Sequence, residues 1–526
     1  MRKMILVNIG IGLLIAPFIP RESFSVWNTK AATAATSAQS SGGCTPVPTI
    51  SPTIPADVLL TNQQNANCFA WQQFIALNWK ASTTTCAADL TVPAGKFGEP
   101  NDTSPVVWET YKEASEVFLP NAAPPSDWCS PQSLPASFAK MKVRNLKKTS
   151  AHGFKVLTAI SKDADNPNLK LSDFTQAFTP GSWLTAQNKY ITLYEIRLNQ
   201  DEFNYIRDNK LYDAAVQQTF VQNPGINLPD GSAQFSKYGN IGSIELKAAW
   251  IQLDDSSLWP YFKTSQAYVV YPWAPTSPKL VTVGLVGLHI IHKTVNGQQF
   301  FWATFEHVNN APSTSDISNK TLKSWYTYYN ANCDPTKDYY KCAWNAGSSP
   351  TTCLPYFPQQ PGDPYQAPMQ VVRTTPISTL STNNIASLNQ FMWQQISAAN
   401  SDSVFLNYQL VNVLWPNNNT TIPAGATTPL TSGDPQPPPN QQLVENTTME
   451  TYFQSCNTCL SCHVNAPIAA VPPLPKPLNV LRLSLSKSLQ ASSATYASDY
   501  SFLLSRAQVP SQPKVIKKTR TGTRGN

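Results

Sequence analysis

The residues best suited to chemistry lie near the C-terminal end of the chain, in the sequence Cys456-Asn-Thr-Cys459-Leu-Ser-Cys462-His463. Within it, Cys459-x-x-Cys462-His463 is the attachment pattern of a c-type haem. Thiols three residues apart on one helical turn can each bond a vinyl group of the porphyrin, and the histidine that follows can give a ring nitrogen to the iron. The pattern predicts one covalently attached haem c, held by Cys459 and Cys462, with His463 as the axial iron ligand.

Three other interpretations of these cysteines are open. An iron–sulfur cluster needs a fourth thiolate besides Cys456, Cys459 and Cys462, and the sequence offers no clear one. A zinc site made of the three cysteines and His463 would crowd its ligands, because structural zinc sites usually split into two separated pairs. A disulfide between neighbouring cysteines would give the motif a purely structural role. We favour haem because a chance match to the spacing of the two cysteines and the histidine is rare, and because the c-type linkage is made outside the cytoplasm.

The sixth ligand of the iron is unknown from the sequence, because neither Met nor His occurs after His463. A protein ligand would have to come from upstream, and the candidates are Met141, His152, His289, His292, His307, Met369, Met392 and Met449. If none of them binds, the open position permits peroxide or oxygen chemistry.

A helix is expected to carry the motif. Thr447 and Glu450 have the spacing of a capping box, which marks a helix start. Apolar and motif residues then recur at helical spacing along one face: Met449, Phe453, Cys456, Leu460 and His463. This helix would place an apolar strip beside the haem.

The body before the motif is expected to be rich in strands, with a few helices. Periodicity predicts one amphipathic helix over 67–80 and a second around 385–396, begun by Ser381 or Thr382. Residues that are β-branched or aromatic predict strands at 190–196, 243–247, 267–271 and 404–415. The fold class is therefore α+β, a strand-rich body with a C-terminal haem-bearing helix like that of cytochromes c.

The strongest local signal is a hairpin. Apolar runs at 279–295 and 298–308 flank Asn296-Gly297, a pair that favours a two-residue type I′ turn. That turn pairs residues whose numbers sum to 593.

Two candidate catalytic residues follow from this register. Glu306 would lie opposite Gly287 and diagonal to His289, on the same face and within side-chain reach. His289 and Glu306 could assist a reaction beside the haem, or His289 could be a buried histidine satisfied by a carboxylate. His292 and His307 would point to the other face, too far apart to share a site.

The charge balance excludes one class of function. The 526 residues carry a net charge of +7, and only 13% of them are charged. The stretch 506–526 alone carries +6 and the first 34 residues carry +3, which leaves the body near −2. A nucleic-acid-binding surface needs a clustered basic face, so no nucleic-acid partner is expected.

The N-terminal end predicts export. Arg2 and Lys3 precede an apolar run at 4–19 that is too short for a membrane-spanning helix, as in a signal peptide. The cleavage site is uncertain, and an uncleaved anchor is the alternative. Ten cysteines in an exported chain predict disulfides and an oxidising compartment, either periplasmic or extracellular. No stable membrane span is expected after cleavage.

The expected organisation follows the chain. It comprises a signal peptide (1–30), a linker (31–60), the strand-rich body (61–420), a Pro-rich linker (421–442), a haem-binding segment packed on the body (443–505) and a basic tail (506–526).

Several segments around the motif resemble a known group of proteins. They are Phe69-Ala-Trp-Gln-Gln-Phe-Ile-Ala-Leu-Asn-Trp79, Gly242-Ser-Ile-Glu-Leu-Lys-Ala-Ala-Trp250, Gly287-Leu-His-Ile-Ile-His-Lys293, Ala303-Thr-Phe-Glu-His-Val308, Asn446-Thr-Thr-Met-Glu-Thr-Tyr452 and Asp499-Tyr-Ser-Phe-Leu-Leu504. Over about 65–505 the chain resembles large exported bacterial proteins of the cytochrome c family with a single haem motif near the C-terminus. The resemblance implies haem binding and electron transfer. It does not indicate a substrate.

The sequence thus predicts an exported single-haem c-type cytochrome that exchanges electrons with a redox partner protein. The first alternative is a haem enzyme of peroxidase or oxygenase type with an open distal site. The second is a surface binding protein with a structural haem.

Overall fold

The computed structural model describes residues 43–59, 62–131, 155–157, 183–271, 277–338, 342–345, 367–415, 444–452, 454, 459–463, 466–471 and 496–510. Apart from Gly43, they belong to one unit that extends from Cys44 to Asn526. The expected signal peptide and the Pro-rich linker lie outside the described residues.

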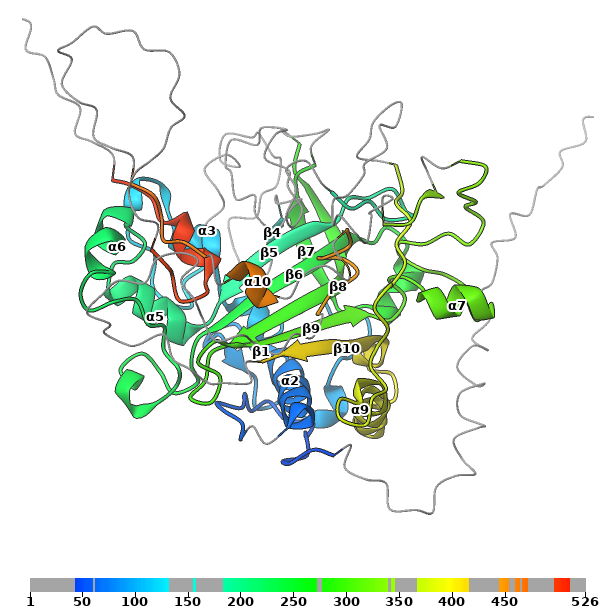
Figure 1. Ribbon diagram of the computed structural model, residues 1–526, viewed down its shortest axis with the longest axis horizontal. Helices are drawn as coiled ribbons and strands as arrows, with labels where there is room; N and C mark the ends of the chain where they lie inside the picture. Colours follow the sequence, from blue (N-terminus) through cyan, green and yellow to red (C-terminus); the bar gives the residue numbers. More distant parts are fainter. Residues whose placement is uncertain are drawn as a thin grey trace, which may run out of the picture. The chain divides into compact units, whose positions relative to one another are not determined.

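A twisted, mostly antiparallel sheet forms the centre of this unit, as Figure 1 shows. Its strands hydrogen-bond in the order β10-β9-β8-β6-β5-β3, while β7 pairs with β8 and β4. The strands are β1 (Ala81–Ser82), β2 (Ala87–Ala88), β3 (Lys112–Glu113), β4 (Lys155–Leu157), β5 (Leu193–Leu198), β6 (Ile244–Gln252), β7 (Thr264–Val269), β8 (Lys279–His292), β9 (Phe301–His307) and β10 (Tyr408–Leu414). The helices are α2 (Gln63–Leu77), α3 (Ala114–Val117), α5 (Gln200–Asp208), α6 (Ala214–Phe220), α7 (Thr314–Asn319), α9 (Ile385–Ala399) and α10 (Cys459–His463). The α+β class is confirmed.

Strand β8 is the longest strand and organises the sheet. One of its edges pairs with β6. Its other edge pairs with β7 over the first part of the strand and with β9 over the last part. Strand β9 then pairs with β10, so the hairpin predicted from the sequence lies inside the sheet.

The register of the β8–β9 hairpin is confirmed, but its predicted turn is wrong. Gly287 pairs with Glu306, as the sum of 593 requires. The ladder stops at His292, however, and the reversal is closed by Thr294 and Gly297, whose backbones exchange hydrogen bonds of 3.3 and 3.1 Å. Val295 and Asn296 are therefore the central residues. Asp57 accepts hydrogen bonds from the backbone and side-chain amides of Asn296, so a tertiary contact overrides the local turn preference.

Both predicted helices of the body are present, with shifted ends. Helix α2 begins after Asn62, whose side chain accepts a hydrogen bond from the Asn65 amide at 2.9 Å. Helix α9 begins after Asn384, whose side chain accepts from the Ser387 amide at 3.0 Å, and not after Ser381 or Thr382. Asparagine is among the strongest N-cap residues, which explains both starts.

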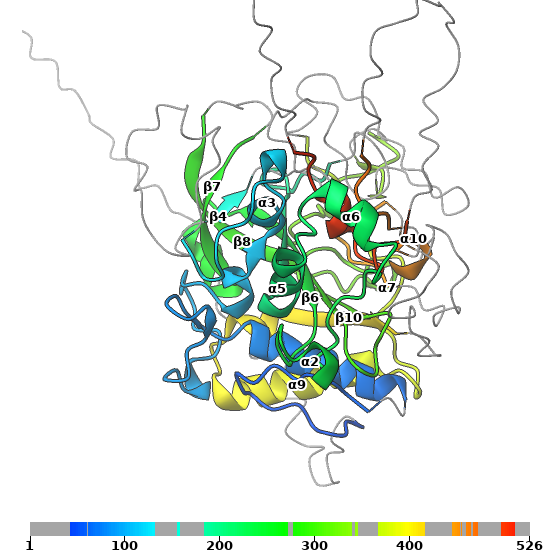
Figure 2. The ribbon, with the colours of Figure 1, turned by 90° about the vertical axis from the view of Figure 1, so that its left-hand side faces the viewer.

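These two helices cover one face of the sheet, where Figure 2 shows them side by side below β10. The helix-covered face presents alternate residues of β9, namely Phe301, Ala303 and Phe305, to the main apolar core. Phe74 of α2 stacks on Phe305 with ring centroids 4.3 Å apart.

The opposite face of the same two strands meets the C-terminal part of the chain. We call it the C-terminal face. It is formed by Gly287, His289 and Ile291 of β8 and by Trp302, Thr304 and Glu306 of β9. The two-residue period of a strand sends these side chains away from the helices.

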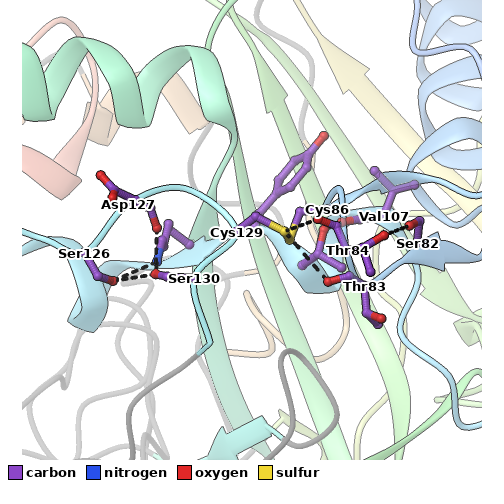
Figure 3. The surroundings of a disulfide bond; sticks show 12 residues. Ser82, Thr83, Thr84, Cys86, Val107, Ser126, Asp127, Cys129 and Ser130 are labelled. Atoms are coloured by element: carbon purple, nitrogen blue, oxygen red, sulfur yellow. Dashed lines mark hydrogen bonds between the residues drawn. A yellow bond between two sulfur atoms is a disulfide. The ribbon is translucent and has the colours of Figure 1, made fainter.

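Three disulfides cross-link the described part of the chain. They join Cys44 to Cys68, Cys86 to Cys129 and Cys333 to Cys342. Figure 3 shows the second, which ties the segment beside Thr84 to the one beside Ser130. Such bonds persist in oxidising compartments, which fits the expected export. Cys353, which follows Cys333 and Cys342 in the sequence, lies outside the described residues.

Among the described residues, no helix combines the length and apolar character needed to cross a membrane.

Candidate functional site

The motif lies on α10, a helix of only five residues that Figure 1 shows in front of the sheet. Cys459, Cys462 and His463 share this single turn. Leu460 is buried in an apolar cluster against which Cys459 also packs. The side chain of Cys462 lies outside the described part of the structure.

The expected long helix through the motif is not found in the described residues. Residues 447–452 form turns, and α10 starts only at Cys459. The predicted capping pair also acts differently. The carboxylate of Glu450 accepts a hydrogen bond from the backbone amide of Asn446, and the Thr447 hydroxyl donates to Glu306 on the sheet. Tertiary bonds to the sheet thus replace a local helix start.

His463 is held in a defined orientation. Its Nδ1 lies 2.7 Å from the carbonyl oxygen of Tyr500. The indole of Trp302 lies against the imidazole, with ring centroids 4.4 Å apart and planes tilted by 58°. Phe502 approaches with its ring centroid at 4.9 Å, nearly perpendicular to the imidazole.

The hydrogen bond fixes the tautomer of His463. A carbonyl oxygen can only accept, so the proton of the neutral ring is on Nδ1 and the lone pair is on Nε2. Histidines that bind metals through Nε2 usually donate Nδ1–H to a carbonyl or carboxylate in this way. The tautomer of His463 is therefore the one that a histidine needs to bind a metal through Nε2.

The Tyr500 carbonyl is positioned by a tight loop. Asp499 and Tyr500 adopt left-handed backbone conformations, with φ of 57° and 64°. The loop is tied to the residues after the motif, because the backbone amide of Ser498 donates to the carbonyl of Ala466 at 3.0 Å. The amide of Ala466 in turn donates to the carbonyl of His463 at 3.1 Å.

Upstream of the motif, residues 444–452 dock on the C-terminal face. The side-chain amide of Asn446 donates to Thr304 Oγ1 at 3.0 Å and to the carbonyl of Phe305 at 2.7 Å. Gly287 permits the close approach, because a Cβ atom there would lie 2.3 Å from Thr448 Oγ1. The chain that leads toward the motif is thereby fixed to β8 and β9.

His289 and Glu306, the candidate catalytic residues, bind this docked segment rather than each other. His289 Nε2 lies 3.1 Å from the carboxylate of Glu450. Glu306 is buried, forms an ion pair with Arg373 and accepts hydrogen bonds from the amide and hydroxyl of Thr447 at 3.1 and 2.7 Å. Their shared face was predicted correctly, but the partners of both side chains came from outside the hairpin.

Two histidine candidates for the sixth ligand have both ring nitrogens engaged. His292 contacts the Gln73 side chain through Nδ1 and the Ile241 carbonyl through Nε2. His307 contacts the Tyr261 carbonyl through Nε2 and the Asn309 amide through Nδ1.

Burial keeps these two histidines neutral. It lowers the pKa of His292 to about 4 and that of His307 to about 3. Coordination of iron would cost either side chain a buried hydrogen bond.

The methionine candidates lie in other parts of the structure. Met392 belongs to the core under the helix-covered face, and Met449 belongs to a separate cluster beside Tyr328. The sulfur of Met369 accepts a hydrogen bond from the Tyr452 hydroxyl at 2.7 Å. Met141 and His152 lie outside the described residues. Within the described ranges, no three histidine, cysteine, aspartate or glutamate side chains cluster as metal ligands.

A buried ionic network lies elsewhere in the sheet. The Lys155 ammonium contacts Glu195 at 2.7 Å and Glu109 at 3.0 Å, and it lies over the rings of Trp108 and Trp250, 4.7 and 4.8 Å from their centroids. Burial opposes ionisation of Glu109, but the nearby lysines outweigh it and lower its pKa to about 2. Because these charges are paired with one another, we assign the network a structural role.

Sequence reasoning did not identify Trp302 or Tyr500 as functional residues. Tyr500 lies in 499–504, one of the segments on which the sequence-based expectation of a cytochrome c rested. Trp302 had no signal, because a tryptophan in a buried strand is most often a core residue.

Comparison with known proteins gives no match: no family model, no curated protein and no solved structure resembles this chain significantly.

Proposed function

We propose that this chain is an exported single-haem c-type cytochrome that exchanges electrons with a redox partner protein. Cys459 and Cys462 attach the haem covalently, and His463 is its proximal ligand. The observation that carries the proposal is the hydrogen bond from His463 Nδ1 to the Tyr500 carbonyl, which puts the ring proton on Nδ1 and the lone pair on Nε2, as in histidines that bind metals through Nε2. When bound, the haem supplies a one-electron carrier.

The residues around His463 have distinct tasks in this proposal. The Tyr500 carbonyl makes the imidazole more basic and holds its tautomer. Trp302 and Phe502 restrict rotation of the ring and keep water from its sides. The docked segment 444–452 anchors the chain that leads to the motif.

Electron transfer is favoured over the haem-enzyme alternative by the contacts of the two candidate catalytic residues. His289 is paired with Glu450, and Glu306 with Arg373 and Thr447. A general acid or base must be able to reach substrate, whereas these side chains already hold the fold together.

Optical spectra of the purified protein, oxidised and reduced, test the proposal. We expect a low-spin c-type spectrum that does not change with cyanide or carbon monoxide, which requires a sixth ligand other than His292 and His307, whose ring nitrogens are engaged. Rapid binding of either ligand to high-spin iron would contradict an electron carrier and favour the enzyme. The double variant Cys459→Ser/Cys462→Ser should lose covalent haem, whereas the matched control Cys333→Ser/Cys342→Ser, which removes a disulfide elsewhere, should keep it.

A further inference from the structure

Four buried charged side chains meet behind the loop that holds His463. Glu202 comes from α5, Glu245 from β6, Lys293 from the residue after β8, and Asp499 from the loop itself. None is more than 3% exposed. We call these four residues the carboxylate cluster.

The cluster contains more acid than base. The Lys293 ammonium forms an ion pair with Asp499 and also donates to Asn227 at 2.8 Å. Within the described part of the structure, both carboxylate oxygens of Glu202, one of Glu245 and one of Asp499 have no hydrogen-bond partner. Three ionised carboxylates around one ammonium would leave two buried negative charges, which cost several kcal/mol unless they are neutralised.

A proton is the charge that fits this site. Burial, reinforced by the neighbouring carboxylates Glu245 and Asp499, raises the pKa of Glu202 well above its ordinary value. Burial also raises the pKa of Glu245 to about 7. A metal ion fits less well, because Lys293 lies among the carboxylates and the described residues include no group arranged as metal ligands.

The other titratable groups around the cluster do not neutralise it. Lys247 lowers the pKa of Glu245, but burial outweighs that effect. Asp230, near Asp499, is held ionised by hydrogen bonds from Ser232 and Gln298 and adds further negative charge. The remaining neighbours, Tyr205 and Tyr500, are neutral phenols, because burial raises the pKa of both.

The cluster is joined to His463 through a few covalent and hydrogen bonds. Asp499 directly precedes Tyr500, whose carbonyl contacts His463 Nδ1. Ser501, on the other side of Tyr500, hydrogen-bonds to Glu245. The same loop therefore bears on the charge of the cluster and on the orientation of the proposed haem ligand.

We propose that the carboxylate cluster is a proton-binding site coupled to reduction of the holoprotein, an inference that rests on the proposed function. A one-electron donor protein supplies the electron, and water supplies the proton. The proton forms an O–H bond with a carboxylate oxygen of Glu202 or Glu245, so the charge of the holoprotein is unchanged by the pair of transfers. Added negative charge nearby favours the protonated carboxyl, so reduction and proton uptake support each other.

The midpoint potential of the holoprotein, measured against pH, tests this coupling. We expect the potential to fall as the pH rises through about 7, by at most about 59 mV for each tenfold change in proton concentration. Glu202→Gln and Glu245→Gln should flatten this slope. Asp208→Asn, which removes an exposed carboxylate from the same helix as Glu202, should preserve it. Haem propionates titrate equally in the wild type and in all these variants, so only the cluster can change the dependence of the potential on pH. The coupling is wrong if both glutamine variants keep the wild-type slope.

Infrared spectroscopy separates failure of the inference from failure of the proposed function. At neutral pH, the wild-type protein should show the C=O stretch of a protonated buried carboxyl, and Glu202→Gln or Glu245→Gln should remove or weaken it. A wild-type protein without this band would overturn the proton site, whatever its haem content. A protein that shows the band but carries no covalent haem would contradict the proposed function, and with it the coupling, but not the protonated cluster.

Discussion

Replacement of Gly287 by alanine tests how the segment before the motif is fixed to the sheet. The backbone at Gly287 suits alanine, so the effect comes from the added methyl group alone. That methyl would lie 2.3 Å from Thr448 Oγ1 and 2.9 Å from Asn446 Oδ1. These two atoms are hydrogen-bonded to each other at 2.7 Å, and the side-chain amide of Asn446 holds the segment to Thr304.

The expected cost can be worked from these contacts. Overpacking of a well-packed site costs about 1–3 kcal/mol. Displacement of the Thr448 hydroxyl loses a buried hydrogen bond worth about 1 kcal/mol. We therefore expect Gly287→Ala to lower the free energy of unfolding by about 2–4 kcal/mol.

Urea unfolding followed by tryptophan fluorescence, with the disulfides intact, measures this change. Gly95→Ala is the matched control, because a Cβ atom there meets nothing closer than the Ala399 carbonyl oxygen at 3.6 Å. The control should stay within about 0.5 kcal/mol of the wild type. If Gly287→Ala is as stable as the control, residues 446–448 do not pack against β8 as described.

Three further predictions concern stability. Arg373→Met should lower the free energy of unfolding by about 3–5 kcal/mol, because it leaves the Glu306 carboxylate buried without its ion-pair partner. Adding Glu306→Gln should recover part of that loss. Equal urea midpoints for the single and double variants would contradict the pairing. The pKa of His307 is about 6.5 in the unfolded chain and about 3 in the folded protein, because burial disfavours the charged ring. As the pH falls below 6.5 the unfolded chain takes up a proton that the folded protein does not, which lowers the free energy of unfolding by about 2 kcal/mol at pH 5. His307→Phe should therefore show a shallower loss of stability between pH 7 and 5 in urea titrations, and an unchanged slope would refute this. Cys44→Ser/Cys68→Ser removes a disulfide between residues 24 positions apart and should lower the free energy of unfolding by about 3.5 kcal/mol, measured by thermal or urea unfolding. An unchanged midpoint would mean that the disulfide does not constrain the unfolded chain.

The elements with strong local periodicity were predictable from sequence. The apolar spacing of α9 and the alternation along β8 and β9 depend on residues close together in the chain, so existence and register could be derived. The ends of α2 and α9 were missed by a few residues, because asparagine caps decide them. The type I′ turn failed because Asp57, some 240 positions away, holds Asn296.

The candidate site could be located from the sequence only through its Cys-x-x-Cys-His motif. Cys459, Cys462 and His463 lie within five residues of one another, so the proposed haem attachment follows from their spacing. The contacts that orient His463 could not be predicted in this way. Trp302 comes from a strand about 160 positions upstream, and the Tyr500 carbonyl is placed by two residues with positive φ, which no residue pattern encodes. The prediction of a long helix before the motif also failed because of distant contacts. The side chains of Thr447 and Asn446 donate hydrogen bonds to Glu306 and Thr304 on the sheet.

The central claim is that Cys459 and Cys462 hold a haem. The most direct measurement is the intact mass, under denaturing conditions, of the protein exported from a bacterium that matures c-type cytochromes. We predict the mass of the mature polypeptide plus one haem, and loss of that increment in Cys459→Ser/Cys462→Ser. A wild-type mass equal to the polypeptide alone, or an increment that persists in the double variant, would contradict the account.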